Sequence, residues 1–120
     1  MTNTTVFLDA VKESIKTFTL TKSTYMAVGT GTTTATAGDT ALETETVRNA
    51  IIESTTGTSD VTVSLLITSA QGNGTDLTEV GAFDASSSGN LMMRATYPAI
   101  TKTASVDVWI DVEEQIDVVQ

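Results

Sequence analysis

Apolar residues recur at every second position along several short segments of this chain, and this alternation limits the folds it can adopt. The clearest segments are residues 61–68, 91–99 and 106–112. Successive side chains of a β-strand point to opposite faces of its sheet, so a period of two predicts a strand with one buried face. Thr and Val are abundant, and their branched side chains pack well in strands but lose rotamer freedom in a helix. We therefore expect a fold that is mainly β.

Less regular segments complete the predicted secondary structure. Residues 25–29 and 77–84 are predicted as strands, and Gly81 within the second indicates a bulge or a close backbone contact. A strand is favoured for residues 42–53, with a short helix beginning at Thr40 as the alternative. Turns are expected at residues 54–60 and 71–75, and a small polar loop at residues 85–90.

One helix is expected, near the N-terminus. Thr4 or Thr5 can cap a helix over residues 6–16. Residues 17–24 are rich in β-branched side chains, so we expect them to be extended. The apolar residues with helical spacing are Phe7, Leu8, Val11 and Ile15.

The chain of 120 residues is predicted to form a single domain, residues 1–120. Strands separated by turn signals every eight to twelve residues or so are typical of a sandwich or barrel. The predicted fold class is a small antiparallel β-sandwich, or a barrel-like variant, with one short N-terminal α-helix. Residues 1–24 form the helix and its lead-in. Residues 29–40, GTGTTTATAGDT, form a flexible loop, because so little apolar bulk cannot build a core.

The chain is acidic, with 15 Asp and Glu against 6 Lys and Arg, a net charge of −9 and a pI near 4.1. The cations form no patch in the sequence and no aromatic residues interleave with them, which argues against nucleic acids and anionic membrane surfaces as partners. Solubility is the simplest interpretation of the acidity, and a salt-rich habitat is the alternative. No apolar run of about 18 residues is present, so we expect no membrane-spanning segment.

The chain has no Cys and no His. Disulfides and thiolate metal ligands are thereby excluded, as are the commonest general base and transition-metal ligand. Residues 29–38 are Gly-rich but lack the spacing and the following Lys of a phosphate-binding loop. We predict that the protein is not an enzyme and that it uses no cofactor and no metal.

A cluster of polar residues near the C-terminus is a candidate binding surface. Asp107, Asp111 and Glu113 share one strand face, where they can form a calcium site or, more simply, a solvated acidic face. Trp109 lies on the same predicted face. An exposed Trp often anchors an interface, whereas burial in the core is the alternative.

Two pairs of opposite charges are candidates for ion pairs. Glu45 can pair with Arg48, and Glu79 with Arg94, across neighbouring strands. Pairs of this kind fix the register of strands and carry no catalytic implication.

Three stretches of the sequence together resemble a known family. They are YMAVGTGTTTATAGDTALETETVR, LTEVGAFDASSSGNLMMRATYPAITKT and VDVWIDVEEQIDV. In this order they are similar to the amino-terminal domain of tail-collar fibre proteins of tailed viruses. That domain has an N-terminal helix, a strand ending in an AVG-like step, a T-x-L-x-x-E-x-x-R element and an E-[LIV]-G-[LA]-[FY]-[DN] strand. The matching pieces are residues 27–29, 40–48, 79–84, 91–94 and Lys102.

The resemblance implies an attachment module that fixes a fibre or collar to the tail tip or baseplate of a virion. The implied partners are further copies of the chain, in a homotrimer or a larger symmetric oligomer, and other virion proteins. Such a protein is made in the host cytoplasm and ends on the particle. The family's shaft and receptor-binding tip have no counterpart in this sequence, so direct host recognition is not part of the expectation.

In such an assembly we expect one set of residues to contribute to interfaces. They are Phe7, Val11, Thr32, Thr34, Glu45, Arg48, Glu79, Arg94 and Trp109. Two alternative functions stay open at this point. One is a decoration protein on the virus head. The other is a carbohydrate-binding sandwich in which Trp109 and Tyr97 are stacking platforms.

Overall fold

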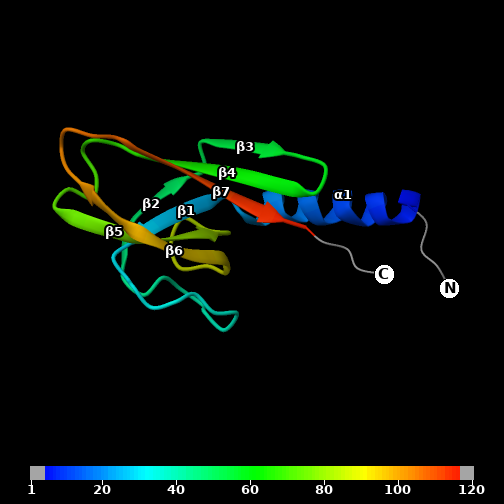
Figure 1. Cartoon of the computed structure of the whole chain (residues 1–120), viewed down its shortest axis with the longest axis horizontal. Coiled ribbons are helices and arrows are strands. Elements are labelled where there is room, and N and C mark those ends of the chain that lie inside the picture. Colours follow the sequence, from blue (N-terminus) through cyan, green and yellow to red (C-terminus); the bar gives the residue numbers. More distant parts are fainter. Residues whose placement is uncertain (1–4, 117–120) are drawn as a thin grey trace.

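The computed structural model of the chain describes residues 5–116, except for the side chain of Phe7. Figure 1 shows strands arranged in two sheets, with one helix extending beyond an end of the sheets. The elements in chain order are α1 (Thr5–Lys22), β1 (Tyr25–Gly29), β2 (Glu45–Ala50), β3 (Glu53–Thr56), β4 (Asp60–Ile67), β5 (Thr75–Phe83), β6 (Leu91–Lys102) and β7 (Val108–Gln115).

The two sheets are antiparallel and form a small sandwich. One sheet has the strand order β2-β1-β5-β6, and the other has the order β3-β4-β7. The predicted fold class of a mainly β, antiparallel sandwich with one N-terminal helix is therefore confirmed. Strand β6 is an edge strand of the first sheet, and β7 is an edge strand of the second. These two edges lie on the same side of the molecule, where a groove runs between them.

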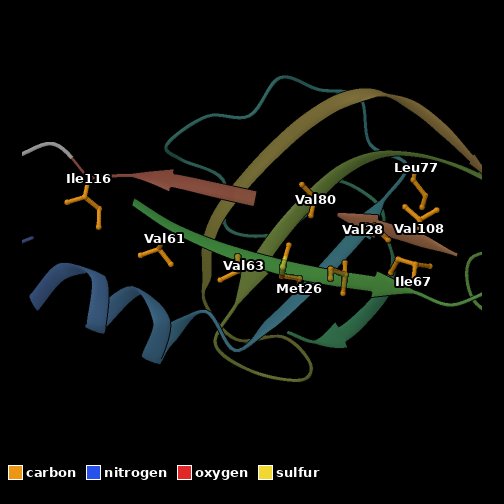
Figure 2. Close-up of a cluster of buried hydrophobic side chains, with 11 residues drawn as sticks. Met26, Val28, Val61, Val63, Ile67, Leu77, Val80, Val108 and Ile116 are labelled. Carbon is orange, nitrogen blue, oxygen red and sulfur yellow. The ribbon is translucent and has the colours of Figure 1, made fainter. Parts of the chain in front are cut away.

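The core lies between the inner faces of the two sheets. On β4, Val61, Val63, Leu65 and Ile67 are all buried, as the alternation of the sequence predicts. Figure 2 shows side chains of the main cluster lying between strands of both sheets, among them Met26 of β1. A Val, Leu or Ile side chain contributes about 1.5–3 kcal/mol when it is fully buried. Aliphatic burial therefore holds the sandwich together despite the low aromatic content.

Helix α1 is longer than expected. It spans 18 residues, so the prediction that residues 17–24 are extended is wrong over 17–22. The hydroxyl of Thr21 donates a hydrogen bond of 2.8 Å to the carbonyl of Thr17, which accommodates a β-branched residue in a helix. Leu20 packs against the core, and this burial stabilises the last turn of the helix. Tertiary contact thus overrides the weak local preference.

Three predictions about the strands need correction. Residues 54–60 are predicted as a turn, but Glu53–Thr56 form β3, an exposed strand paired with β4. All four side chains of β3 are exposed, so the segment has no alternation to reveal it. Within the region 42–53, β2 covers Glu45–Ala50, and the alternative of a helix there is wrong. The last strand begins at Val108, two residues later than predicted.

Strand β5 carries the irregularities that Gly81 indicates. A Cβ at Gly81 would lie 2.8 Å from a methyl carbon of Leu42 and 2.9 Å from one of Leu91, so the predicted close contact is confirmed. A second irregularity lies further along, where residues 97–99 of β6 face Thr78 alone. Such bulges redirect side chains near sheet edges, and this one lies beside the groove between β6 and β7.

The molecule is elongated because α1 extends away from the sandwich (Figure 1). Its principal extents are 56 × 27 × 25 Å, and its radius of gyration is 15.8 Å. A compact domain of this length is expected to have a radius of gyration of about 13.6 Å. Within residues 5–116, no helix is long and apolar enough to span a membrane.

Candidate functional site

A buried carboxylate on the first sheet joins three segments of the chain. Glu79 of β5 has no solvent exposure. Its Oε2 accepts hydrogen bonds from the amides of Gly31 (2.6 Å) and Thr44 (3.0 Å). Its Oε1 accepts hydrogen bonds from the amide of Glu43 (2.8 Å) and from Nε of Arg94 (3.1 Å). We call these groups, with the partners of Arg94, the Glu79 network.

Arg94 of β6 extends the network to the middle of the long loop between β1 and β2. Its Nη1 lies 3.0 Å from Oδ2 of Asp39, and its Nη2 donates a hydrogen bond of 2.9 Å to the carbonyl of Thr33. The Arg94 side chain is 3% exposed, and Glu79 is its diagonal neighbour on β5, since the register pairs Arg94 with Gly81. The predicted ion pair between Glu79 and Arg94 is therefore confirmed as a contact between neighbouring strands.

The network stabilises the charged form of each member. Burial by itself raises the pKa of Glu79, but the amides of Thr44 and Glu43 and the Arg94 guanidinium outweigh it and lower that pKa. The pKa of Asp39 is also lowered, chiefly by the amide of Thr36. The site is a fixed carboxylate–guanidinium pair, and every donor around Glu79 holds it in the ionised state.

The loop between β1 and β2 is tied to the sandwich through this network. A Cβ at Gly31 would overlap Oε2 of Glu79, so only glycine allows the carboxylate to approach the backbone this closely. The hydroxyl of Thr78 also donates a hydrogen bond of 2.6 Å to the carbonyl of Gly31. The segment predicted as a flexible loop thus has irregular structure with fixed points at Gly31, Thr33 and Asp39. Its mobility stays a prediction.

A second charged group lies on β2, the strand at the other edge of the same sheet from β6. Arg48 pairs with Glu45 at 2.6 Å, and its Nη1 donates hydrogen bonds to the carbonyls of Ala85 (3.0 Å) and Ser88 (2.8 Å). The guanidinium carbon lies 3.6 Å from the centre of the Phe83 ring, a cation–π contact. The predicted pair exists, but both of its members are on β2, so it does not join two strands. Arg48 instead holds the loop after β5 through its hydrogen bonds to that loop.

An apolar groove lies between the edge strands β6 and β7. It has a volume of about 540 Å³. Its lining includes two aromatic side chains, Tyr97 of β6 and Trp109 of β7, with Ile100 beside them. Trp109 is 48% exposed, so its predicted exposure is confirmed and the alternative of burial in the core is wrong. Burial raises the pKa of Tyr97 to about 12, so its hydroxyl stays protonated at neutral pH. We call this hollow the β6–β7 groove.

Acidic residues follow the rim of this groove. Asp111 and Glu113 line it and are exposed, while Asp107 precedes the start of β7. Asp111 accepts hydrogen bonds from the Ser64 hydroxyl and from Nε1 of Trp109, and these bonds lower its pKa. Within residues 5–116, no group of three or more acidic side chains is arranged to hold a metal ion. The solvated acidic face is the arrangement observed.

Helix α1 carries an apolar stripe that is only partly covered, with Ile15 lying beside Gln115 and Ile116 at the end of β7. The stripe consists of Leu8, Val11, Ile15 and Phe18, spaced by three, four and three residues along one side of the helix. Leu8 and Val11 are half-buried, while Ile15 is 39% and Phe18 58% exposed. We call these four residues the α1 stripe.

Different residues of α1 contact the sandwich. Nζ of Lys16 is 2.8 Å from the carbonyl of Gly57, and Nζ of Lys12 is 3.2 Å from the Ser59 hydroxyl. Lys16 is 5% exposed. The helix therefore docks through these lysine side chains next to the turn between β3 and β4, and through Leu20, which packs against the core.

The residues predicted as interface residues fall into three groups. Glu79 and Arg94 are buried in the Glu79 network, and the Arg48 side chain is 8% exposed beside Glu45. Thr32 and Thr34 are exposed in the long loop, Val11 is half-buried in α1, and Trp109 is exposed on β7. The side chain of Phe7 lies outside the described residues. An interface role stays a prediction for each of them.

Sequence reasoning missed three residues that the structure makes central. Asp39 pairs with Arg94 across a separation of 55 residues, which no local pattern reveals. Leu42 is buried against Phe83 in a second, smaller cluster. Lys102 has no exposure, and its Nζ donates hydrogen bonds to Oδ1 of Asn73 (2.8 Å) and to the Thr103 carbonyl (2.7 Å). The only signal for Leu42 and Lys102 was their place in the resemblance motifs.

No protein-family model matches this sequence, and no curated protein matches it significantly.

Proposed function

We propose that this protein is a structural component of a tailed-virus particle, an attachment module of the tail-fibre or baseplate type that acts by protein–protein assembly. The proposal starts from the resemblance of residues 27–29, 40–48, 79–84 and 91–94 to tail-collar attachment domains. These segments are distant in the sequence. In the fold they meet in one sheet, around the Glu79 network and Arg48.

The observation that carries the proposal is that the motif residues are buried, while several large apolar side chains are exposed. The motif residues Glu79, Arg94 and Leu42 are buried, and Glu79 and Arg94 hold the long loop against the first sheet. The larger exposed apolar side chains include Phe18 on α1 and Trp109 on β7. Such an arrangement suits a rigid module with partners at its helix and at its open sheet edge, since exposed apolar patches and sheet edges are typical contact surfaces.

The test of this proposal is the location of the chain in purified virus particles. We expect mass spectrometry of disassembled particles to find the protein in the tail or baseplate fraction, and sedimentation of the isolated protein to show a trimer or a larger ring. A monomer at high concentration and high salt, together with absence from every particle fraction, would contradict the proposal.

The same measurement decides between the tail and the head. A decoration protein on the head would be present in hundreds of copies per particle, in proportion to the major capsid protein. A tail-tip or baseplate component would be present in a dozen copies or fewer, on the symmetry grounds that govern such rings. We favour the tail because the resemblance is to tail attachment domains.

One observation favours a second candidate function, carbohydrate binding. Tyr97 and Trp109 lie on different sheets, yet they line the same groove together with Asp111. Aromatic side chains next to polar groups suit the apolar faces and hydroxyls of sugars. Binding on a glycan array that Trp109→Ala abolishes without changing the sedimentation of the protein would favour this function over assembly. Absence of glycan binding would dismiss it.

A further inference from the structure

The α1 stripe and the β6–β7 groove are two apolar surfaces that the described part of the subunit leaves partly uncovered, and they complement each other in form and charge. We propose that the α1 stripe of one copy of this protein docks into the β6–β7 groove of a second copy. The inference rests on the proposed function and deepens it, because it names the contact that joins the copies.

The helix supplies a narrow apolar ridge. An 18-residue helix is about 27 Å long, and the α1 stripe runs along about 15 Å of that length. Phe18, its most exposed member at 58%, projects near the end that joins the sandwich. A helix that inserts an apolar stripe into a groove is a common mode of recognition.

The groove supplies the matching hollow. Its floor is apolar, with Tyr97, Ile110 and Val112, and Ile100 and Trp109 are exposed at its edges. The groove lies between two edge strands, β6 and β7, each of which has only one neighbour in its sheet. A partner seated here would cover the edges of both sheets at once, which is how many assemblies protect such strands.

Charge favours the helix of another copy as the occupant. Helix α1 carries three of the six cationic residues, Lys12, Lys16 and Lys22, but only two of the fifteen acidic ones, in a chain of net charge −9. Those two, Asp9 and Glu13, line a hollow against residues 56–58 and lie away from the stripe.

Lys22 continues the stripe at its C-terminal end, since it lies seven residues after Ile15. The described lining of the groove contains Asp111 and Glu113 and no Lys or Arg. The stripe therefore brings a cation to an acidic rim, an arrangement that favours this pairing over others.

Parallel pairing of two α1 stripes with each other is less favourable. In a parallel pair of helices, equivalent residues approach each other, so Lys22 of one copy would face Lys22 of the next. Docking into the groove avoids this repulsion and also covers the exposed side of Trp109. The contact is head-to-tail, so each copy supplies one helix and one groove. Such contacts generate closed rings when the rotation between copies closes.

Disulfide trapping tests the contact, and the chain has no Cys to interfere. Phe18→Cys and Ile100→Cys are made as separate proteins, mixed at equal concentration and oxidised mildly. Both side chains are exposed, so the substitutions leave the core intact. The control mixture pairs Phe18→Cys with Thr55→Cys, which puts the second thiol on an exposed position of β3 at the opposite edge.

We expect several-fold more mixed disulfide from the Phe18→Cys and Ile100→Cys mixture than from the control mixture. A disulfide only between two Phe18→Cys copies would show helix–helix pairing and overturn the inference, as would mixed disulfide no more abundant than in the control. A sugar that protects Ile100→Cys from modification, with no mixed disulfide, would assign the groove to glycan and also overturn it. Ile15→Cys provides a second helix position if Phe18→Cys folds poorly.

The trapping result and the particle result are independent. If the protein is found in tail or baseplate fractions and no mixed disulfide forms, the inference fails while the proposed function stands. If the mixed disulfide forms and no particle fraction contains the protein, the contact stands and the proposed function fails.

Discussion

The carboxylate of Glu79 accepts four hydrogen bonds at a site with no solvent exposure, and three of its donors are backbone amides of the loop between β1 and β2. The fourth donor, Arg94, supplies the compensating charge and also forms an ion pair with Asp39. A buried charge is tolerated when its lone pairs are satisfied and an opposite charge is adjacent. The side chain of Glu79, on β5, thus fixes the path of the loop between β1 and β2.

Replacing Glu79 with Gln is expected to lower the free energy of unfolding by about 3–5 kcal/mol, because it leaves a buried guanidinium partly uncompensated and places an amide group among donors. Urea denaturation at pH 7 measures the change. Glu45→Gln is the matched control. It removes a carboxylate paired with Arg48 on a more exposed side chain, and we expect a loss of less than about 1 kcal/mol. Equal losses in both variants would contradict the central role of Glu79.

The same network makes stability sensitive to acid. The folded pKa of Glu79 lies below its ordinary value of 4.5, so its contribution is complete above that value and is lost as the pH falls through the folded pKa. We expect the free energy of unfolding of the wild-type protein to decrease as the pH falls below about 5. In Glu79→Gln the decrease is smaller, because this group no longer titrates. Denaturation series at several pH values test the sign, and an unchanged slope in the variant would refute it.

Gly81 is the residue that lets Leu42 and Leu91 approach the backbone of β5. In Gly81→Ala the new methyl group would meet both leucines at 2.8 and 2.9 Å, and the Met93 carbonyl at 3.1 Å. We expect a loss of about 1–3 kcal/mol, as for other overpacked sites. In Gly38→Ala the methyl group would meet only the Thr36 hydroxyl, at 3.9 Å, so a change within about 0.5 kcal/mol is expected. Thermal denaturation compares the two, and a tolerated Gly81→Ala would contradict this packing.

At the scale of elements, alternation predicted those strands that have one buried face. Strand β4 follows its pattern through Val61, Val63 and Leu65, because each of these side chains points into the core. Strand β3 has no buried face, so nothing in residues 53–56 distinguishes it from a turn. The last turn of α1 was missed for a related reason. Local propensity favoured an extended chain, and only the contact of Leu20 with the core decides the matter.

The candidate site was predictable to a similar degree. The pair of Glu79 and Arg94 follows from opposite charges on strands that are neighbours in the sequence. Its third member, Asp39, comes from a loop whose path depends on the network itself. The meeting of Tyr97 and Trp109 in one groove depends on which strands end the two sheets. That order is a property of the whole fold, so no segment contains the information.

Helix α1 is attached to the sandwich through few contacts, and Lys16 is central among them. Its ammonium group reaches the Gly57 carbonyl at 2.8 Å beside the turn between β3 and β4. Lys16→Ala leaves that carbonyl without this donor, and we expect a loss of about 1–3 kcal/mol with faster amide hydrogen exchange throughout α1. Ser14→Ala is the control, since Ser14 is an exposed residue of α1. Unchanged exchange in Lys16→Ala would show that other contacts hold the helix.

At the scale of the whole molecule, the extension of α1 has an energetic consequence. A helix that lies largely outside the sandwich gains little from its own subunit, and most of the stability of a helix in a protein comes from the packing of its apolar face. A second copy that covers the α1 stripe would stabilise the helix and the edges of β6 and β7 together. The acidic surface of the chain, with its net charge of −9, limits indiscriminate association, so specific contacts near the cationic helix are favoured.

Association through the α1 stripe makes thermal stability depend on protein concentration, because a partner that binds only the folded chain stabilises it by mass action. We expect the Tm of the wild-type protein to rise with concentration and that of Phe18→Glu to stay constant, since a carboxylate on the stripe opposes docking against the acidic groove. Val6→Glu is the control. Val6 is 81% exposed on α1 but lies off the stripe, so its variant should behave like the wild type. A Tm that is independent of concentration in all three proteins, measured by calorimetry over a hundredfold range or so, would show that the stripe drives no self-association.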